Sequence, residues 1–177
     1  MKKIVSCALA IGVLAATLVM VDGAAAQTAA AAEPTADEKV AGLEQMCAQA
    51  AEAIAARQKE SSLYDRVGGR EAIHAVVAGT VERHLVNAAI KHTLEGVDTD
   101  NLIKHVTDFL VVATGGQGKY GGRDMHSAHA HLSLTNTDFL AAGGDLGAAM
   151  ATAGWGESEA QEMLCAFVSL RGEVVTQ

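Results

Sequence analysis

The chain has 177 residues, half of them apolar, with a single proline and only 3% aromatic residues. This is enough apolar material for the core of one modest domain, and an alanine-rich, proline-poor composition is typical of a helical fold rather than a β-sandwich. The formal charge of −8 argues against a nucleic-acid partner, because binding to phosphates requires a basic surface.

Residues 1–26 have the pattern of a secretory signal peptide. Lys2 and Lys3 form the positive end, Ile4–Val21 is the apolar stretch, and Ala24–Ala26 is a small-residue cleavage site. Cleavage would reduce the basic residues from 13 to 11 and the acidic residues from 21 to 20, so the mature charge would be −9. We therefore expect an exported protein, periplasmic in a Gram-negative bacterium. An uncleaved membrane anchor is the alternative, since the apolar stretch is long.

Residues 27–35 are expected to be an alanine-rich linker, followed by an extra helix over residues 36–60 and a main domain over residues 61–177. Thr35 and Glu38 form a capping-box pattern at the start of this helix. Its apolar residues follow helical spacing on one stripe: Val40, Leu43, Cys47, Ala50 and Ile54. The stripe requires a cover, either the main domain or a second subunit; the alternative is a helical stalk.

Two cysteines follow the signal segment, Cys47 in the extra helix and Cys165 near the C-terminus. In an oxidising compartment such a pair can form a disulfide, which would dock the extra helix on the last helix. The alternative is two buried free thiols that pack as small apolar side chains.

The first part of the main domain reads as three helices. Ser61–Gly69 predicts a short helix that ends in a sharp glycine turn, and Glu71–Val86 predicts the next helix. Asp98–Thr114 predicts the third, with Asp98 as its N-cap. The apolar stripe of this third helix contains Leu102, His105, Val106, Phe109 and Leu110. Phe109–Val112 is also compatible with a buried strand, but the helical pattern is longer.

A glycine-rich loop over Gly115–Gly122 leads to a short helix that carries His129. Met125 lies one turn before this histidine and Leu132 one turn after it, so the imidazole lies on an apolar helical face. His105 is placed in the same way on its own helix. Two such helices can hold a flat metal cofactor between them, and histidine is the usual proximal ligand of haem iron in globins. The alternative for His129 is a hydrogen-bonded core residue, and the alternative for His105 is a surface-directed or hydrogen-bonded histidine.

The C-terminal part predicts two more helices. Thr137–Thr152 carries an apolar stripe with Phe139, and Gly154-Trp155-Gly156 forms a turn. Ser158 and Gln161 form a second capping-box pattern. The last helix is apolar on nearly all sides, which predicts burial; its apolar residues are Met163, Leu164, Phe167, Val168 and Leu170.

Several short motifs follow one another along the main domain in this order: Leu63–Gly69, Gly115-Gly116, Tyr120-Gly121, Met125, His129 and Phe139. Their order and spacing resemble group I of the truncated haemoglobin family, over Ser61–Val175. The resemblance implies an all-α fold, the two-over-two helical sandwich of truncated globins, to which the N-terminal helix is an addition. It also implies that His129 is the proximal ligand of haem iron and that His105 faces the iron from the distal side, as a ligand or as a contact to bound gas.

The chain departs from the family at two aromatic pairs. Thr80-Val81 stands where the family usually has Phe-Tyr, whose tyrosine donates a hydrogen bond to iron-bound oxygen. Thr93-Leu94 replaces a Phe-Phe pair, so a phenyl ring that packs on the haem face is missing. These losses argue against oxygen storage of the usual kind.

The expected haem contacts combine the distal wall, the loop end and the pocket floor. They are His129, His105, Val81, Leu94, Leu102, Val106, Phe109, Tyr120, Met125 and Phe139. Tyr120 is expected to reach a haem propionate, or else to pack as a loop-end aromatic residue. The remaining histidines are expected at the surface: His74, His84, His92, His126 and His131. Because the sequence has no Cys-x-x-Cys-His run, we expect haem b, held non-covalently.

Three functions are compatible with these patterns. The first is an exported b-type haem protein that binds diatomic gases (O2, NO or CO); some relatives oxidise nitric oxide, so a dioxygenase activity served by a reductase or other redox partner stays open. The second is a bis-histidine haem protein for electron transfer or for redox or gas sensing. The third is a helical interaction protein that has lost haem. Spectra of the iron separate all three.

Overall fold

The computed structural model describes residues 32–177, so the predicted signal peptide and most of the predicted linker lie outside the described part. Within it the chain is helical, without strands, and no helix there is long and apolar enough to cross a membrane. The α-helices are α1 (Ala36–Glu60), α2 (Leu63–Val67), α3 (Arg70–Val86), α4 (Thr99–Ala113), α5 (Met125–His129), α6 (Asn136–Thr152), α7 (Glu157–Ser169) and α8 (Arg171–Val174).

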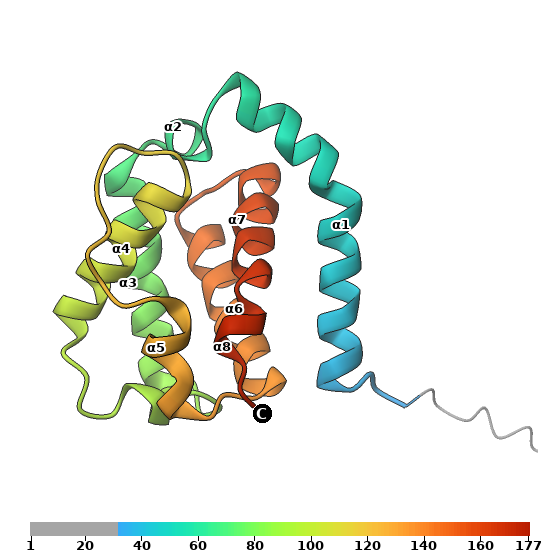
Figure 1. The fold of residues 1–177 in the computed structure, drawn as a ribbon, viewed down its shortest axis with the longest axis vertical. Helices are drawn as coiled ribbons and strands as arrows, with labels where there is room; N and C mark the ends of the chain where they lie inside the picture. The colour runs from blue at the N-terminus through green and yellow to red at the C-terminus, as the bar shows by residue number, and fades with distance from the viewer. Residues whose placement is uncertain (1–31) are drawn as a thin grey trace, which may run out of the picture. The chain divides into compact units, whose positions relative to one another are not determined.

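Two helix pairs form the body of the domain (Figure 1). Helix α3 packs on α4 and also on α6, and α6 packs on α7, so the pair α3/α4 lies over the pair α6/α7. The core between the pairs includes Ile73, Val76 and Val77 of α3, Val111 of α4 and Met150 of α6, all at most 2% exposed. This arrangement confirms the predicted two-over-two sandwich.

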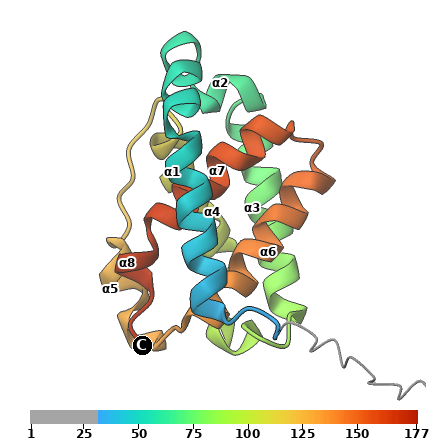
Figure 2. The same cartoon turned by 90° about the vertical axis from the view of Figure 1, so that its right-hand side faces the viewer.

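Helix α1 covers the outer side of α6 and α7 (Figure 2). Its predicted start is confirmed, because the Thr35 hydroxyl accepts from the backbone of Glu38 while the Glu38 carboxylate accepts from the backbone of Thr35. Val40 is buried, and Cys47 forms a disulfide with Cys165 of α7 across a Cα–Cα distance of 5.4 Å. In this structure the main domain covers the stripe of α1, which contradicts the stalk alternative.

A buried carboxylate joins α1, α2 and α7. The side chain of Glu162 is only 2% exposed and accepts hydrogen bonds from Arg66 of α2 and from Gln58 of α1. Arg57 lies 3.6 Å from the same carboxylate, and Arg66 also pairs with Glu159. A buried charge requires such partners to offset its lost hydration. The prediction that the helix containing Met163 and Phe167, which is α7, is apolar on nearly all sides is therefore wrong at Glu162.

Two glycine turns set the entry to α3 and the exit from α4. Gly68 and Gly69 have φ of +97° and +80°, the left-handed region that glycine adopts without strain, which confirms the predicted sharp turn. After α4, a Cβ added to Gly116 would lie 2.5 Å from the Tyr64 ring, so only glycine fits this approach. The start of the long loop thus packs against α2.

One alternative and one prediction from the sequence are wrong. Phe109–Val112 belongs to α4, whose N-cap Asp98 accepts from the backbone of Asn101 as predicted, so the strand is excluded. The capping box at Ser158 does not form, because α7 already begins at Glu157 after an extended Gly156. An N-cap at Ser158 would start the helix at Glu159, two residues later than the observed start.

Asp108 connects α3 to α4, because it pairs with Arg70 of α3 and with Lys104 one turn earlier on its own helix. Hydrogen bonds from Lys104 and Arg70 lower the pKa of Asp108 to about 2. A carboxylate whose pKa is depressed by folding stabilises the folded state above its unfolded value and loses this effect as pH falls towards the folded value. We expect Asp108→Asn to destabilise the domain by less than about 1 kcal/mol at neutral pH, as is usual for exposed pairs. Urea unfolding should show the difference shrinking between about pH 4 and pH 2; a difference independent of pH would contradict this.

Candidate haem pocket

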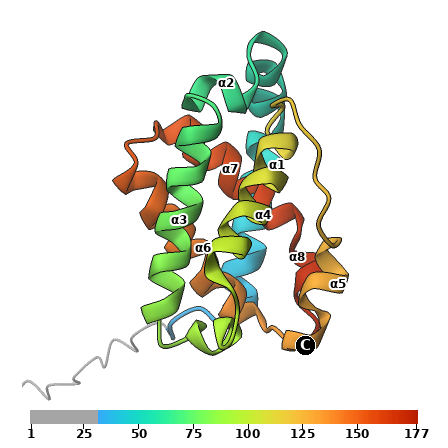
Figure 3. The ribbon, with the colours of Figure 1, turned by 90° about the vertical axis from the view of Figure 1, so that its left-hand side faces the viewer.

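A cavity of about 990 Å³ lies between α3, α4, α5 and the pair α6/α7. The long loop that closes it runs alongside α4 to α5 (Figure 3). The ten side chains expected from the sequence all line this single cavity: His129, His105, Val81, Leu94, Leu102, Val106, Phe109, Tyr120, Met125 and Phe139. The lining is mostly apolar, and its volume is in the range of small-molecule sites.

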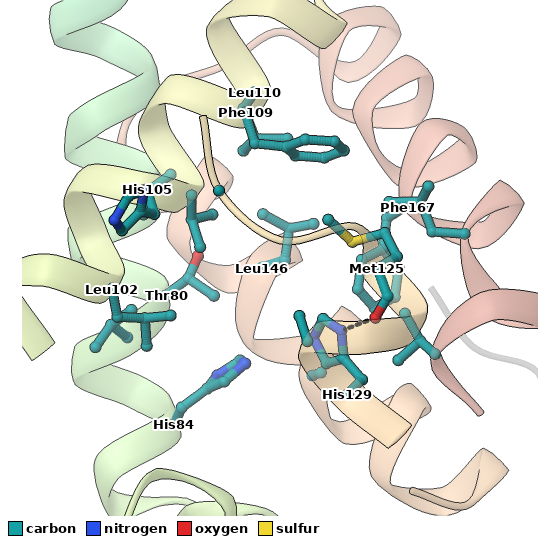
Figure 4. Close-up of a pocket in the computed structure, with 18 of the residues that line it drawn as sticks. Thr80, His84, Leu102, His105, Phe109, Leu110, Met125, His129, Leu146 and Phe167 are labelled. Atoms are coloured by element: carbon teal, nitrogen blue, oxygen red, sulfur yellow. Dashed lines mark hydrogen bonds between the residues drawn. The ribbon is translucent and has the colours of Figure 1, made fainter. Parts of the chain in front are cut away.

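His129 is the last residue of α5, a short helix capped by Asp124, which accepts from the backbone of Ser127. Its Nδ1 lies 2.7 Å from the Met125 carbonyl oxygen, one turn earlier (Figure 4). A carbonyl oxygen only accepts, so Nδ1 carries the proton and Nε2 keeps its lone pair. This is the arrangement that orients a metal-ligating histidine. The sequence predicted the apolar setting of His129 but not this partner.

His105 reaches the same cavity from α4, on the face that also presents Leu102, Val106 and Phe109 (Figure 4). Its side chain is half-buried. The structure therefore brings together the two imidazoles that the sequence singled out, one from α4 and one from α5.

The distal wall is apolar at the two positions where the chain departs from the family. Val81 is 6% exposed and its side chain has no hydrogen-bond donor, and Leu94 lines the same cavity. The neighbouring hydroxyls are already used, since Thr80 donates to the Val76 carbonyl and Thr93 to the Ile90 carbonyl. No hydroxyl from these pairs is thus left to donate to a ligand.

Tyr120 lies at the end of the long loop, edge-on to Phe109 at a ring-centroid distance of 5.3 Å. Its hydroxyl donates to the Arg123 carbonyl at 2.7 Å. In this structure Tyr120 is a packing aromatic residue whose hydroxyl holds the loop, and a contact to a propionate stays a prediction.

The floor of the cavity is a stacked aromatic pair. Phe139 of α6 lies 4.3 Å from Phe167 of α7, centroid to centroid, with the rings 15° from parallel. Phe167 also lines the cavity, although the sequence placed it only in a buried helix.

His84 was expected at the surface, and this expectation is wrong. The side chain is 18% exposed, lines the cavity from α3, and has its Nδ1 2.9 Å from Oδ2 of Asp145 on α6. His74, His92 and His126 are exposed as predicted. His131 is exposed too, although it contributes to the rim of the cavity.

These features fit a flat iron porphyrin. The cavity has apolar walls and an aromatic floor. It also contains the imidazole of His129, whose tautomer is fixed by a backbone carbonyl so that Nε2 is free to bind iron. A second imidazole, His105, approaches from another helix. No group of three or more His, Cys, Asp or Glu side chains that could hold a bare metal ion occurs within residues 32–177.

Comparisons with known proteins point to one family. The profile of the bacterial-like globin family matches residues 62–176. A group 1 truncated hemoglobin from Nostoc sp. (strain MUN 8820) is 31% identical over 117 residues, which cover 66% of this chain and 99% of that protein. The crystal structure of truncated hemoglobin from Tetrahymena pyriformis in its Fe(III) form has a TM-score of 0.61 at 26% identity and covers 66% of this chain and 100% of its own.

The 2/2 hemoglobin from Synechococcus sp. PCC 7002, solved in the cyanomet state with covalently attached heme, shares the fold with a TM-score of 0.61 at 24% identity, again over 66% of this chain and all of its own. The family profile begins at residue 62, so α1 lies outside the region that it matches. The chain belongs to the bacterial-like globin family, and it has the fold of the truncated 2/2 hemoglobins.

Proposed function

We propose that this chain is an exported haem b protein that binds diatomic gases at an iron held by Nε2 of His129. Haem-based gas binding in general is supported by membership of the globin family. The observation that carries the proposal is the hydrogen bond from His129 Nδ1 to the Met125 carbonyl, at a cavity of suitable size and polarity. The bound haem would supply the iron coordination chemistry; the protein holds it, orients it and limits access to it.

Non-covalent attachment is supported by the sequence, which has no Cys-x-x-Cys-His run. Export is supported by the signal-like pattern of residues 1–26 and by the pairing of Cys47 with Cys165, since disulfides persist in oxidising compartments. Nitric oxide oxidation, with a reductase as partner, stays a hypothesis that the rapid loss of the oxygenated protein on addition of nitric oxide would support.

A bis-histidine resting state is the second candidate, because His105 of α4 and His129 of α5 line the same cavity. If His105 occupies the iron about nine-tenths of the time, exogenous gases bind about tenfold more weakly, or about 1.4 kcal/mol. The resting protein would then be six-coordinate and low-spin, which suits electron transfer or sensing.

We expect His105→Leu to retain haem but to change its spectrum from six-coordinate low-spin to five-coordinate, with about tenfold tighter binding of carbon monoxide. Absorption spectra of the ferric and ferrous variant, followed by a carbon monoxide titration, measure both effects. His74→Leu, an exposed histidine of α3, is the control and should leave the spectrum unchanged. A His105→Leu spectrum identical to that of the wild type would show that His105 does not bind the iron.

A further inference from the structure

The cavity contains a third imidazole. His84 lies three positions after Val81, so both share the face of α3 that lines the cavity. Figure 4 shows the His84 ring extending from α3 into the space that His105 and His129 also face. Neither candidate iron ligand is within hydrogen-bonding reach of His84 among the contacts of residues 32–177.

An acidic side chain pairs with this ring. Asp145 of α6 places its Oδ2 2.9 Å from His84 Nδ1, and the side-chain amide of Asn87 donates to the same oxygen at 3.0 Å. Asp145 is only 16% exposed, so the carboxylate is shielded from water and anchored by Asn87. A carboxylate facing Nδ1 favours the tautomer with the proton on that nitrogen, which leaves the Nε2 lone pair as an acceptor.

The surroundings keep His84 able to take up a proton. Burial lowers the pKa of His84, and the charge of Asp145 opposes this shift, so the ring is neutral at neutral pH while its cation has a partner ready. Asp145 is the only ion-pair partner of His84 among the described residues. The other titratable side chains that line the cavity are Asp98, His105, Tyr120, Arg123, His129, His131 and Asp138.

We infer that His84, oriented by Asp145, is a general base of the haem pocket and that the pocket takes small weak acids as ligands, such as hydrogen sulfide, hydrogen peroxide or hydrogen cyanide. The inference rests on the proposed function. In this step the H–X bond breaks, the proton passes to Nε2 of His84, and X⁻ keeps the electron pair with which it binds the iron. No oxidant or reductant is required. A base held by a carboxylate at a binding site typically accelerates proton transfer by two to four orders of magnitude.

The apolar distal wall makes this role specific to protic ligands. Val81 cannot donate to a ligand, whereas a neutral His84 accepts a proton from one. Carbon monoxide has no proton to lose, so its binding should not depend on His84. The ratio of the association rate constants of a protic ligand and of carbon monoxide therefore separates the effect of the base from the effect of the pocket's shape.

The test compares association rate constants in stopped-flow experiments at neutral pH, where hydrogen cyanide is mainly undissociated. His84→Gln and Asp145→Asn are prepared in the His105→Leu background, so that a distal ligand cannot mask the step. We expect cyanide to bind the ferric His84→Gln protein at least about tenfold more slowly, with Asp145→Asn intermediate, while carbon monoxide binds the ferrous proteins within about twofold of the parent. Glutamine fills a similar space without a basic nitrogen, so rescue by glutamine would mean a packing role and overturn the inference.

The pH dependence of the cyanide association rate gives an independent readout. With His84 present, the rate should fall as the pH drops through the lowered pKa of His84, because a protonated imidazole cannot accept another proton; with His84→Gln this dependence should be absent. Equal cyanide rates and an equal pH dependence in the two proteins would refute the role of His84. Failure of the parent to bind carbon monoxide would instead refute the proposed haem function.

Discussion

Replacing His129 with alanine is expected to abolish haem retention. His129 lines the cavity with its Nδ1 on the Met125 carbonyl oxygen, so its Nε2 is the nitrogen free to bind the iron. Loss of a group that merely orients a ligand weakens metal binding 10–100-fold, so loss of the ligand itself should weaken haem binding by more than about 100-fold. Haem titration of the variant, followed by desalting and an absorption spectrum, measures this.

His126→Ala is the matched control, because His126 lies on the same short helix α5 but is exposed. The control should retain a full complement of haem with an unchanged spectrum. The wild-type protein should also melt at a lower temperature without haem than with it, since a ligand that binds only the folded state stabilises that state. A His129→Ala protein with normal haem content and spectrum would refute the assignment of His129 as the iron ligand.

Loss of the disulfide should have the largest effect on stability. Cys47 and Cys165 are 118 positions apart, so their bond restricts a long loop in the unfolded chain. The chain-entropy treatment gives about 5 kcal/mol for a loop of this length, and measured losses for native disulfides are about 2–5 kcal/mol. We expect Cys47→Ser to lower the free energy of unfolding by about 2–5 kcal/mol in urea titrations under oxidising conditions.

Reduction provides the control for this prediction. Under reducing conditions the wild type should lose nearly all of its advantage over Cys47→Ser, and Cys165→Ser should behave like Cys47→Ser. Haem binding should survive in each, because neither cysteine lines the haem cavity. If the oxidised wild type and Cys47→Ser unfolded at the same urea concentration, the cross-link would not contribute to stability.

The sequence predicted much of the fold because its signals are local. The pair Thr35 and Glu38 marked the start of α1, and Gly68-Gly69 marked the turn into α3. The helical spacing around His105 and His129 placed both imidazoles on cavity-facing sides. These patterns depend on residues at most four positions apart, so they can be read without tertiary structure.

What the sequence missed depends on residues that are distant along the chain. From the sequence, His84 looked like a surface residue because its partner Asp145 lies on another helix. Asn87, which also binds the Asp145 carboxylate, is 58 positions before Asp145. The position of His84 one turn after Val81 was the one local signal that could have placed His84 in the cavity. Glu162 escaped notice for the same reason, since its partners Arg66 and Gln58 lie in α2 and α1.

The capping pattern at Ser158 shows the opposite error, a local signal that tertiary structure overrides. The extended Gly156 starts α7 early, and the Arg66 pair with Glu159 then holds the first turn in place. Sequence motifs at helix ends thus locate a boundary only to within a few residues.

The most direct test of haem binding by His129 is the absorption spectrum of the full-length protein after incubation with hemin and removal of unbound pigment. We expect one haem per chain, a Soret band characteristic of histidine-ligated iron, and a shift of that band when carbon monoxide is added to the reduced protein. A protein that stays colourless, or that releases all pigment on desalting, would contradict the central claim that His129 holds haem in this cavity.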